Sequence, residues 1–228
     1  MTPQAQLRLE FEPRPALGGD DFLVAPNNAE AVTWLDRWPD WPSTALVIHG
    51  PPGCGKSHLC QVFLAASEAR HIGVSDLTRN PADVLLADAP AAVIDRAETA
   101  LAAGAERPLF HLFNHLSETG RKLLLTARAP VSRWPVDLPD LHSRLATAVS
   151  AEIGPPDDPL IAAVIVKLFA DRQLRIDDGV VTYLLSRMER SFDAARQLVS
   201  AIDDAALAEH RNITVPLVRK VLKAIERI

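Results

Sequence analysis

A glycine-rich stretch that ends in a lysine and a serine has the residue types and spacing needed to bind phosphate groups. Gly50, Gly55, Lys56 and Ser57 occupy the fixed positions of the pattern G-x-x-x-x-G-K-[ST]. Glycines let backbone N–H groups turn toward phosphate oxygens, the lysine suits β- and γ-phosphates, and the serine hydroxyl suits Mg²⁺. We therefore predict a nucleotide-binding P-loop. Its candidate residues are Gly50, Pro51, Pro52, Gly53, Cys54, Gly55, Lys56, Ser57 and His58.

The elements on either side of this loop fit the same chemistry. Residues 45–48 are a short apolar run, which predicts a buried strand. Leu59, Val62 and Phe63 follow at helical spacing, so a helix should begin at the end of the loop. A helix start adds partial positive charge where the phosphates would lie. A Gly-Pro turn that merely resembles the pattern is the alternative, and it requires neither the strand nor the helix.

Two further predicted strands end in polar side chains. Residues 91–94 are apolar and lead into Asp95, a carboxylate that could hold Mg²⁺ opposite Ser57. A strand end that is simply capped by an aspartate is the alternative. Residues 122–126 form another apolar run and end in Thr126, as a sensor of the γ-phosphate would. With a short strand expected at 71–74 and a helix from Pro81 to Leu86, the alternation predicts an α/β fold with a parallel sheet.

The character of the chain changes after residues 154–156. Helical patterns follow near 158–173, 177–188, 193–209 and 214–227, and residues 157–159 (Asp-Asp-Pro) provide a cap and a first-turn proline. We therefore predict three parts: a flexible N-terminal segment (1–19) without regular structure, an α/β nucleotide-binding core (20–154) and a small all-helical domain (155–228).

Composition limits the partners and the compartment. The chain has 228 residues, 48% of them hydrophobic, and a net charge of −5, so no general attraction to nucleic acid is expected. Two cysteines, Cys54 and Cys60, favour reduced thiols over a disulfide framework. We find no apolar run as long as a membrane span and no signal peptide. These features predict a cytoplasmic protein that does not interact with membranes.

A hexapeptide near the N-terminus resembles a known docking motif. Gln6, Leu9 and Phe11 match Q-x-x-L-x-F, by which bacterial proteins bind the DNA polymerase III sliding clamp (its beta subunit). An extended segment could place the two apolar side chains in a pocket while the glutamine bonds at its edge. The alternative is an N-terminal strand that packs on its own domain.

Longer similarities, in order over roughly residues 20–225, resemble the DnaA-related branch of the AAA+ ATPases. Residues 109–114 (Leu-Phe-His-Leu-Phe-Asn) look like a helix that carries a Phe-His-x-Phe-Asn pattern in DnaA initiators. The resemblance implies further roles: an adenine-binding segment, an arginine finger in the box 141–145, and the sensor 2 arginine. These roles fall on Phe22, Leu23, Val24 and Asn28, on Arg144, and on Arg196, respectively.

The resemblance also implies a function. DnaA initiators continue into a DNA-binding domain, which this sequence does not contain, and the clamp-like hexapeptide stands at its front. That combination is similar to Hda-type regulatory inactivators of DnaA. These dock on the clamp, contact DNA only through it, and promote hydrolysis of ATP held by DnaA. A self-associated form that buries the clamp motif is compatible with the sequence.

Departures from the initiator pattern affect the expected chemistry. Arg96 stands where initiators carry a second acidic residue that orients the attacking water, and Glu98 is two positions further on. Arg128 replaces an acid, and Ala25 replaces a glycine. A site that binds ADP or ATP with Mg²⁺ but does not orient water should hydrolyse ATP weakly at most. Arg144 would then act in trans, on the ATP of a neighbouring molecule.

Two other functions remain open from sequence. One is an autonomous AAA+ ATPase or helicase-loader-like protein, which predicts robust ATP turnover without DnaA. The other is a non-catalytic adaptor bound to the clamp, which predicts clamp binding with no effect on any ATPase. For Arg144, the alternative to a finger is a structural ion pair within the chain.

Overall fold

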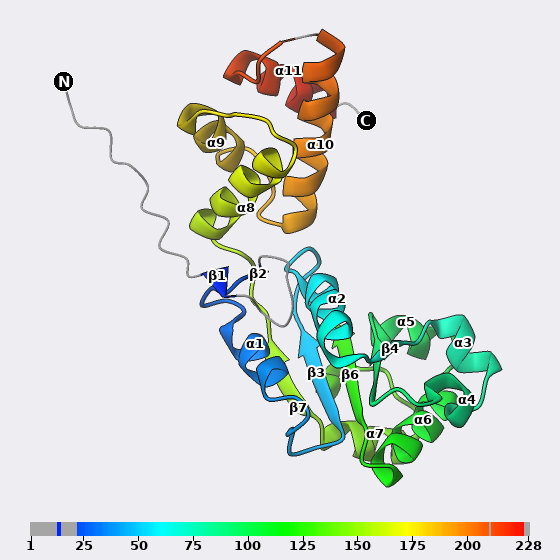
Figure 1. Cartoon of the computed structure of the whole chain (residues 1–228). Coiled ribbons are helices and arrows are strands. Elements are labelled where there is room, and N and C mark those ends of the chain that lie inside the picture. Colours follow the sequence, from blue (N-terminus) through cyan, green and yellow to red (C-terminus); the bar gives the residue numbers. More distant parts are fainter. Residues whose placement is uncertain (1–12, 15–21, 210, 226–228) are drawn as a thin grey trace. The chain divides into compact units, whose positions relative to one another are not determined.

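Five parallel strands form the centre of residues 12–154 in the computed structural model, which describes residues 13–14, 22–209 and 211–225 (Figure 1). Their order across the sheet is β4-β5-β6-β3-β7. The bounds are β3 Ala45–His49, β4 Arg70–His71, β5 Ala91–Ile94, β6 Lys122–Ala127 and β7 Val149–Glu152. The expected α/β class with a parallel sheet is therefore confirmed.

Helices cover both faces of this sheet, and this explains why the strands are continuous apolar runs. Residues of β3 alternate between two cores: Ala45 and Val47 pack on one side, Leu46 and Ile48 on the other. Strands that are buried on both faces need apolar residues at every position. The helices on the first side are α3 (Val74–Arg79), α4 (Ala82–Leu86), α5 (Ala97–Ala102), α6 (Glu106–Glu118) and α7 (Pro139–Ala146). Those on the second side are α1 (Ala29–Asp36) and α2 (Lys56–Ser67).

Two local predictions need correction. The strand expected at 71–74 is only Arg70–His71, because α3 begins at Val74, after its N-cap Gly73, and buries Leu77 in the core. The first 19 residues were expected to lack regular structure. Within that range, Pro13–Arg14 form a two-residue strand, β1, antiparallel to β2 (Phe22–Leu23). A proline is compatible with so short a strand, since only one edge is paired.

The second unit, residues 155–228, is helical as expected. Its helices are α8 (Asp158–Asp171), α9 (Asp178–Leu185), α10 (Phe192–Glu209) and α11 (Val215–Ile225). The carboxylates of Asp157 and Asp177 cap α8 and α9 by accepting hydrogen bonds from Leu160 N and Val180 N, at 2.9 and 2.8 Å. These helices enclose a core of their own, which includes Ile165, Phe169 and Val218, so the unit has the anatomy of a small domain.

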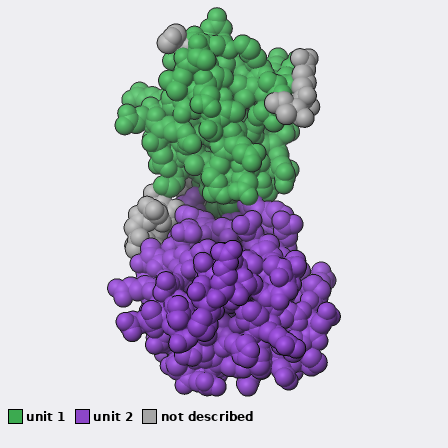
Figure 2. Space-filling view, turned by 90° about the vertical axis from the view of Figure 1, so that its right-hand side faces the viewer, with its two compact units in different colours: residues 1–11, 155–228 green, residues 12–154 purple. Residues whose placement is uncertain are grey.

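Figure 2 colours the two compact units separately, with the division after Gly154. Within the described ranges, no helix is both long and apolar enough to cross a bilayer.

Candidate functional site

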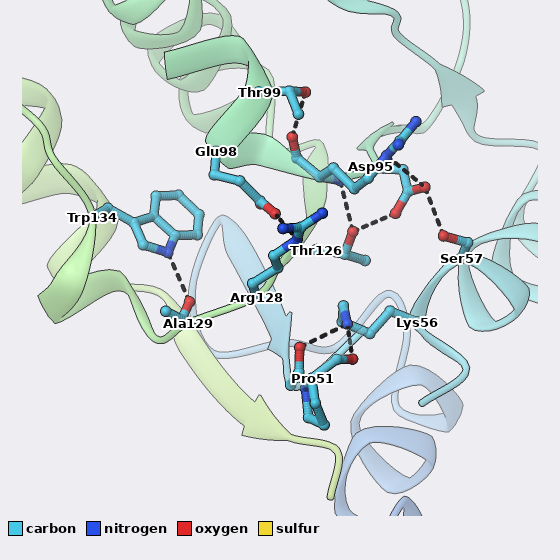
Figure 3. A network of polar contacts seen from close by, with 12 residues as sticks. Pro51, Lys56, Ser57, Asp95, Glu98, Thr99, Thr126, Arg128, Ala129 and Trp134 are labelled. Atoms are coloured by element: carbon cyan, nitrogen blue, oxygen red, sulfur yellow. Dashed lines mark hydrogen bonds and ion pairs between the residues drawn. The ribbon is translucent and has the colours of Figure 1, made fainter. Parts of the chain in front are cut away.

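The glycine-rich loop connects β3 to α2, at the carboxyl edge of the sheet where α/β proteins bind ligands. Gly53 and Gly55 have φ values of 69° and 106°, which favour residues without a Cβ. Lys56 is only 8% exposed, and its Nζ donates hydrogen bonds of 2.7 Å to both the Gly50 and Pro51 carbonyls (Figure 3). The lysine ammonium is thus held inside the curve of the loop, where a polyphosphate would need it.

Gly50 lies against the end of the neighbouring strand. A Cβ at this position would lie 2.1 Å from the Ile153 carbonyl oxygen, far inside contact distance. Gly50 N also donates to the Ala127 carbonyl at 3.2 Å. The first glycine of the motif is therefore required by the packing of the loop between two strands.

Ser57, Asp95 and Thr126 form one hydrogen-bonded group. The Ser57 hydroxyl donates to Asp95 Oδ2 at 2.8 Å, and the Thr126 hydroxyl donates to Asp95 Oδ1 (Figure 3). The register between β5 and β6 pairs Ile94 with Leu125, which brings Asp95 level with Thr126. A serine hydroxyl facing a carboxylate at the start of a helix is the donor set that holds Mg²⁺ beside nucleotide phosphates. The residues present therefore fit a Mg²⁺–nucleotide complex.

Arg96 occupies the position of the second acidic residue in the initiator pattern. Its backbone is left-handed, with φ 58°, and its N–H donates to Thr126 Oγ1 at 2.8 Å. Its guanidinium is largely exposed, and Nε lies 3.9 Å from Asp95 Oδ2. Asp95 therefore has a cation beside it where initiators have a carboxylate.

Glu98 and Arg128 form an ion pair that sequence reasoning missed. Glu98 Oε1 lies 3.6 Å from Arg128 Nε (Figure 3). No sequence pattern could identify this contact, since α5 and the segment after β6 meet only when the sheet forms.

Two titratable groups near the loop are kept neutral by their surroundings. Burial, and secondarily the charge of Asp95, raises the pKa of the Cys60 thiol. Burial lowers the pKa of His49, at the end of β3, despite the opposing effect of Glu152. Neither side chain therefore adds charge beside the phosphate loop at neutral pH.

The predicted base-binding segment is stabilised from within. Asn28 is 1% exposed; its Oδ1 accepts from Ala25 N at 2.9 Å and its Nδ2 donates to Leu23 O at 3.0 Å. Asn28 therefore fixes the shape of the loop. The next contact links this loop to the sheet: Asn27 Nδ2 donates to the Gly154 carbonyl at 3.1 Å.

The remaining predicted site residues are carried by other elements. Arg144 is exposed on α7, and no described side chain pairs with it. Arg196 lies on α10 in the helical unit and is paired with Asp193, one turn earlier, at 2.5 Å. Gln6, Leu9 and Phe11 fall outside the described residues.

A glycine-rich loop on a five-stranded parallel sheet of this order, followed in the chain by a four-helix domain, is an AAA+-like fold. Solved structures share this fold: domain III of DnaA from Thermotoga maritima has a TM-score of 0.78 at 17% identity, over 89% of this chain and 94% of that chain. AMPPCP-bound DnaA from Aquifex aeolicus has a TM-score of 0.69 at 16% identity, over 84% of this chain and 66% of that chain. The RuvB R170A protein of Thermotoga maritima has a TM-score of 0.66 at 15% identity, over 90% and 70%.

Sequence comparison is more specific. Residues 162–222 match the family model described as the Hda lid domain. An uncharacterized protein of Haemophilus influenzae is 27% identical over 190 residues, which are 77% of this chain and 80% of that protein. Residues 162–222 thus match the lid domain of Hda, and the chain as a whole shares the fold of DnaA domain III.

Proposed function

We propose that the protein is a negative regulator of DNA replication initiation that stimulates hydrolysis of ATP bound to the DnaA initiator. The observation that carries this proposal is Arg144, which is exposed on α7 and has no side-chain partner among the described residues. A structural ion pair would occupy its guanidinium, whereas a finger must remain available to another molecule. An arginine supplied in trans to a γ-phosphate is worth about 10³–10⁵ in rate in GTPases.

The protein's own site binds ADP or ATP with Mg²⁺ in this proposal. Lys56 inside the loop, and the Ser57–Asp95 pair at its end, support nucleotide binding. Thr126 would sense the γ-phosphate, and Arg196 would approach it as sensor 2. Because Arg96 stands beside Asp95 in place of an acid, we expect weak intrinsic ATPase activity at most. The bound nucleotide would then set the shape of the protein while Arg144 acts on the partner.

Recruitment to DNA would come from the hexapeptide. Gln6, Leu9 and Phe11 are proposed to dock on the beta subunit of the DNA polymerase III sliding clamp, and DNA is contacted only through the clamp. The net charge of −5 supports an indirect contact. A cytoplasmic location follows from these partners.

The experiment that tests the function is hydrolysis of radiolabelled ATP bound to DnaA, with this protein, and with or without clamp loaded on DNA. We expect hydrolysis that requires both. Arg144→Ala should abolish stimulation while it preserves clamp binding, and Arg79→Ala, which removes another exposed arginine on α3, is the matched control.

Each other outcome supports a different function. ATP consumed by this protein alone, with DnaA-bound ATP intact, would indicate an autonomous ATPase or a loader. Clamp binding without hydrolysis in any arrangement would indicate an adaptor. Stimulation that survives Arg144→Ala would remove the finger from the proposal.

A further inference from the structure

The start of α5 and the end of β6 are joined by one ion pair, Glu98–Arg128. It lies beside the hydrogen-bonded group of Ser57, Asp95 and Thr126. Both backbones are fixed. Arg96, two residues before Glu98, donates its N–H to Thr126 at 2.8 Å, and Thr99 Oγ1 donates to the Arg96 carbonyl at 2.7 Å. On the other side, Trp134 Nε1 donates to the Ala129 carbonyl at 2.7 Å, directly after Arg128 (Figure 3). The pair is therefore positioned by the same network that orients Asp95.

The Glu98 carboxylate is unusual for a charged group. Both of its oxygens are shielded from solvent and have no hydrogen-bond partner among the described residues. Its ion pair with Arg128, at 3.6 Å, is longer than a hydrogen bond. A shielded carboxylate without hydrogen bonds is costly, so its unused acceptor capacity calls for a donor such as a water molecule.

Arg128 limits what Glu98 can bind. In Figure 3 the Arg128 guanidinium lies between the Glu98 carboxylate and the Thr126 hydroxyl. Thr126 is bonded to Asp95, which faces Ser57, so in this view Arg128 stands on the side of Glu98 that faces the proposed nucleotide site.

We propose that Arg128 suppresses hydrolysis of the protein's own ATP by holding Glu98 away from the attacking water. Glu98 is then the carboxylate that substitutes for the acid missing at position 96, and Arg128 is a positioning residue. The inference rests on the proposed binding of ATP at the P-loop, and it concerns the protein's own nucleotide rather than that of DnaA.

The suppressed step is ordinary phosphoryl transfer to water. The water oxygen bonds to the γ-phosphorus while the bond from that phosphorus to the β–γ bridging oxygen breaks, which gives ADP and inorganic phosphate. The released Glu98 would accept hydrogen bonds from the water and take its proton, which then passes to solvent. A positioned general base contributes about 10²–10⁴ in rate. A carboxylate that is freed but not ideally placed should recover a smaller share, about tenfold.

The pair can be removed without damage to the fold. The Arg128 side chain is 68% exposed, so its truncation to alanine leaves no cavity in the core, and thermal unfolding of the variant measures the cost of leaving Glu98 without its cation. Arg128→Ala should therefore fold normally, and its effect on hydrolysis can be separated from an effect on stability.

The test is single-turnover hydrolysis of ATP by the full-length protein alone, with ATP and ADP affinities measured on the same samples. Arg128→Ala should raise the hydrolysis rate about tenfold, with nucleotide affinity nearly unchanged. Arg128→Lys keeps the cation and should stay at the wild-type rate. The double variant Arg128→Ala/Glu98→Gln should lose the gain.

Other outcomes overturn the proposal. If ATP binds but Arg128→Ala hydrolyses it at the wild-type rate, the pair has no inhibitory role, and the proposed regulator function is unaffected. If the gain in Arg128→Ala persists in the double variant, Glu98 is not the responsible carboxylate. If the wild-type protein does not bind ATP, this inference and the proposed nucleotide site both fail, whereas stimulation of DnaA remains separately measurable.

Discussion

Ser57 and Asp95 are joined by a 2.8 Å hydrogen bond although 38 residues separate them in the chain. The contact forms because β3 and β5, on either side of β6, end at the same edge of a parallel sheet. Ser57 lies in the first turn of the helix after the glycine-rich loop, and Asp95 follows a buried strand. In the proposed function, their meeting would supply the ligands for Mg²⁺ beside the glycine-rich loop.

Asp95→Asn tests the metal side of this pair. The amide keeps the shape of the carboxylate but loses its charge, so Mg²⁺ should contribute less to nucleotide binding. Substitution of a carboxylate that supports a metal typically costs 10–100-fold in metal affinity, and we expect the Mg²⁺-dependent gain in ADP or ATP affinity to fall by about tenfold. Titration of a fluorescent nucleotide, with Mg²⁺ and with EDTA, measures the gain.

The control for this substitution is Asp88→Asn, which removes an exposed carboxylate on the same unit. A Mg²⁺-dependent gain equal to that of the wild-type protein in Asp95→Asn would show that Asp95 does not serve the metal.

Gly50→Ala tests whether the loop needs glycine for packing or only for phosphate contact. The added methyl group would lie 2.1 Å from the backbone oxygen of Ile153, and a strand carbonyl cannot move aside cheaply. We expect a loss of about 2–3 kcal/mol or more in the free energy of unfolding, even without nucleotide. Urea unfolding followed by circular dichroism provides the measurement.

Gly120→Ala is the matched control for Gly50→Ala. Gly120 has φ 69°, but a Cβ there would meet nothing within 4 Å. Gly120→Ala should lower the free energy of unfolding by about 1 kcal/mol, the cost of placing alanine in a left-handed backbone conformation. Equal losses in the two variants would mean that the contact with Ile153 relaxes and that packing does not require the first glycine.

Sequence predicted the central strands and the helices of the second unit because their patterns are local. The run Ala45–His49 before the loop and the caps Asp157 and Asp177 depend on neighbours in the chain, and each occurs where the pattern placed it. The short helix α3 was missed because six residues contain too little periodicity to separate a helix from a strand.

The site was only partly predictable for a different reason. Asp95 and Thr126 could be found because strand ends mark the edge of a sheet, whereas the Glu98–Arg128 contact depends on how α5 leaves β5. That direction is set by the left-handed conformation of Arg96, and left-handed backbone is uncommon for a residue other than glycine. Asn28 was assigned to the nucleotide from a resemblance, and the structure shows its bonds to the loop itself.

Thiol reactivity tests the environment of the loop. Cys54 and Cys60 are both buried, and burial together with the charge of Asp95 raises the pKa of Cys60. Since the thiolate is the reactive form, Cys60 should remain neutral from pH 7 to 9, and raising the pH within this window should not activate it. We expect alkylation by iodoacetamide at pH 8 to be about 100-fold slower in the native protein than in urea. One thiol that reacts natively at the rate of a free cysteine would contradict the described packing.

Thr126→Val examines the residue that links the Mg²⁺ group to the start of α5. Thr126 is fully buried; its hydroxyl donates to Asp95 and accepts the N–H of Arg96 at 2.8 Å. Valine fills the same volume but leaves that N–H without its acceptor, which should cost about 1–3 kcal/mol in the free energy of unfolding.

Thr99→Val, which removes an exposed hydroxyl bonded to the Arg96 carbonyl, should cost less than about 1 kcal/mol. The Thr126 hydroxyl also orients the Asp95 carboxylate, which is proposed to serve Mg²⁺. Thr126→Val should therefore reduce the Mg²⁺-dependent gain in nucleotide affinity, and Thr99→Val should not. Equal effects of the two substitutions on both measurements would mean that the Arg96 N–H finds another acceptor and that Asp95 keeps its orientation without Thr126.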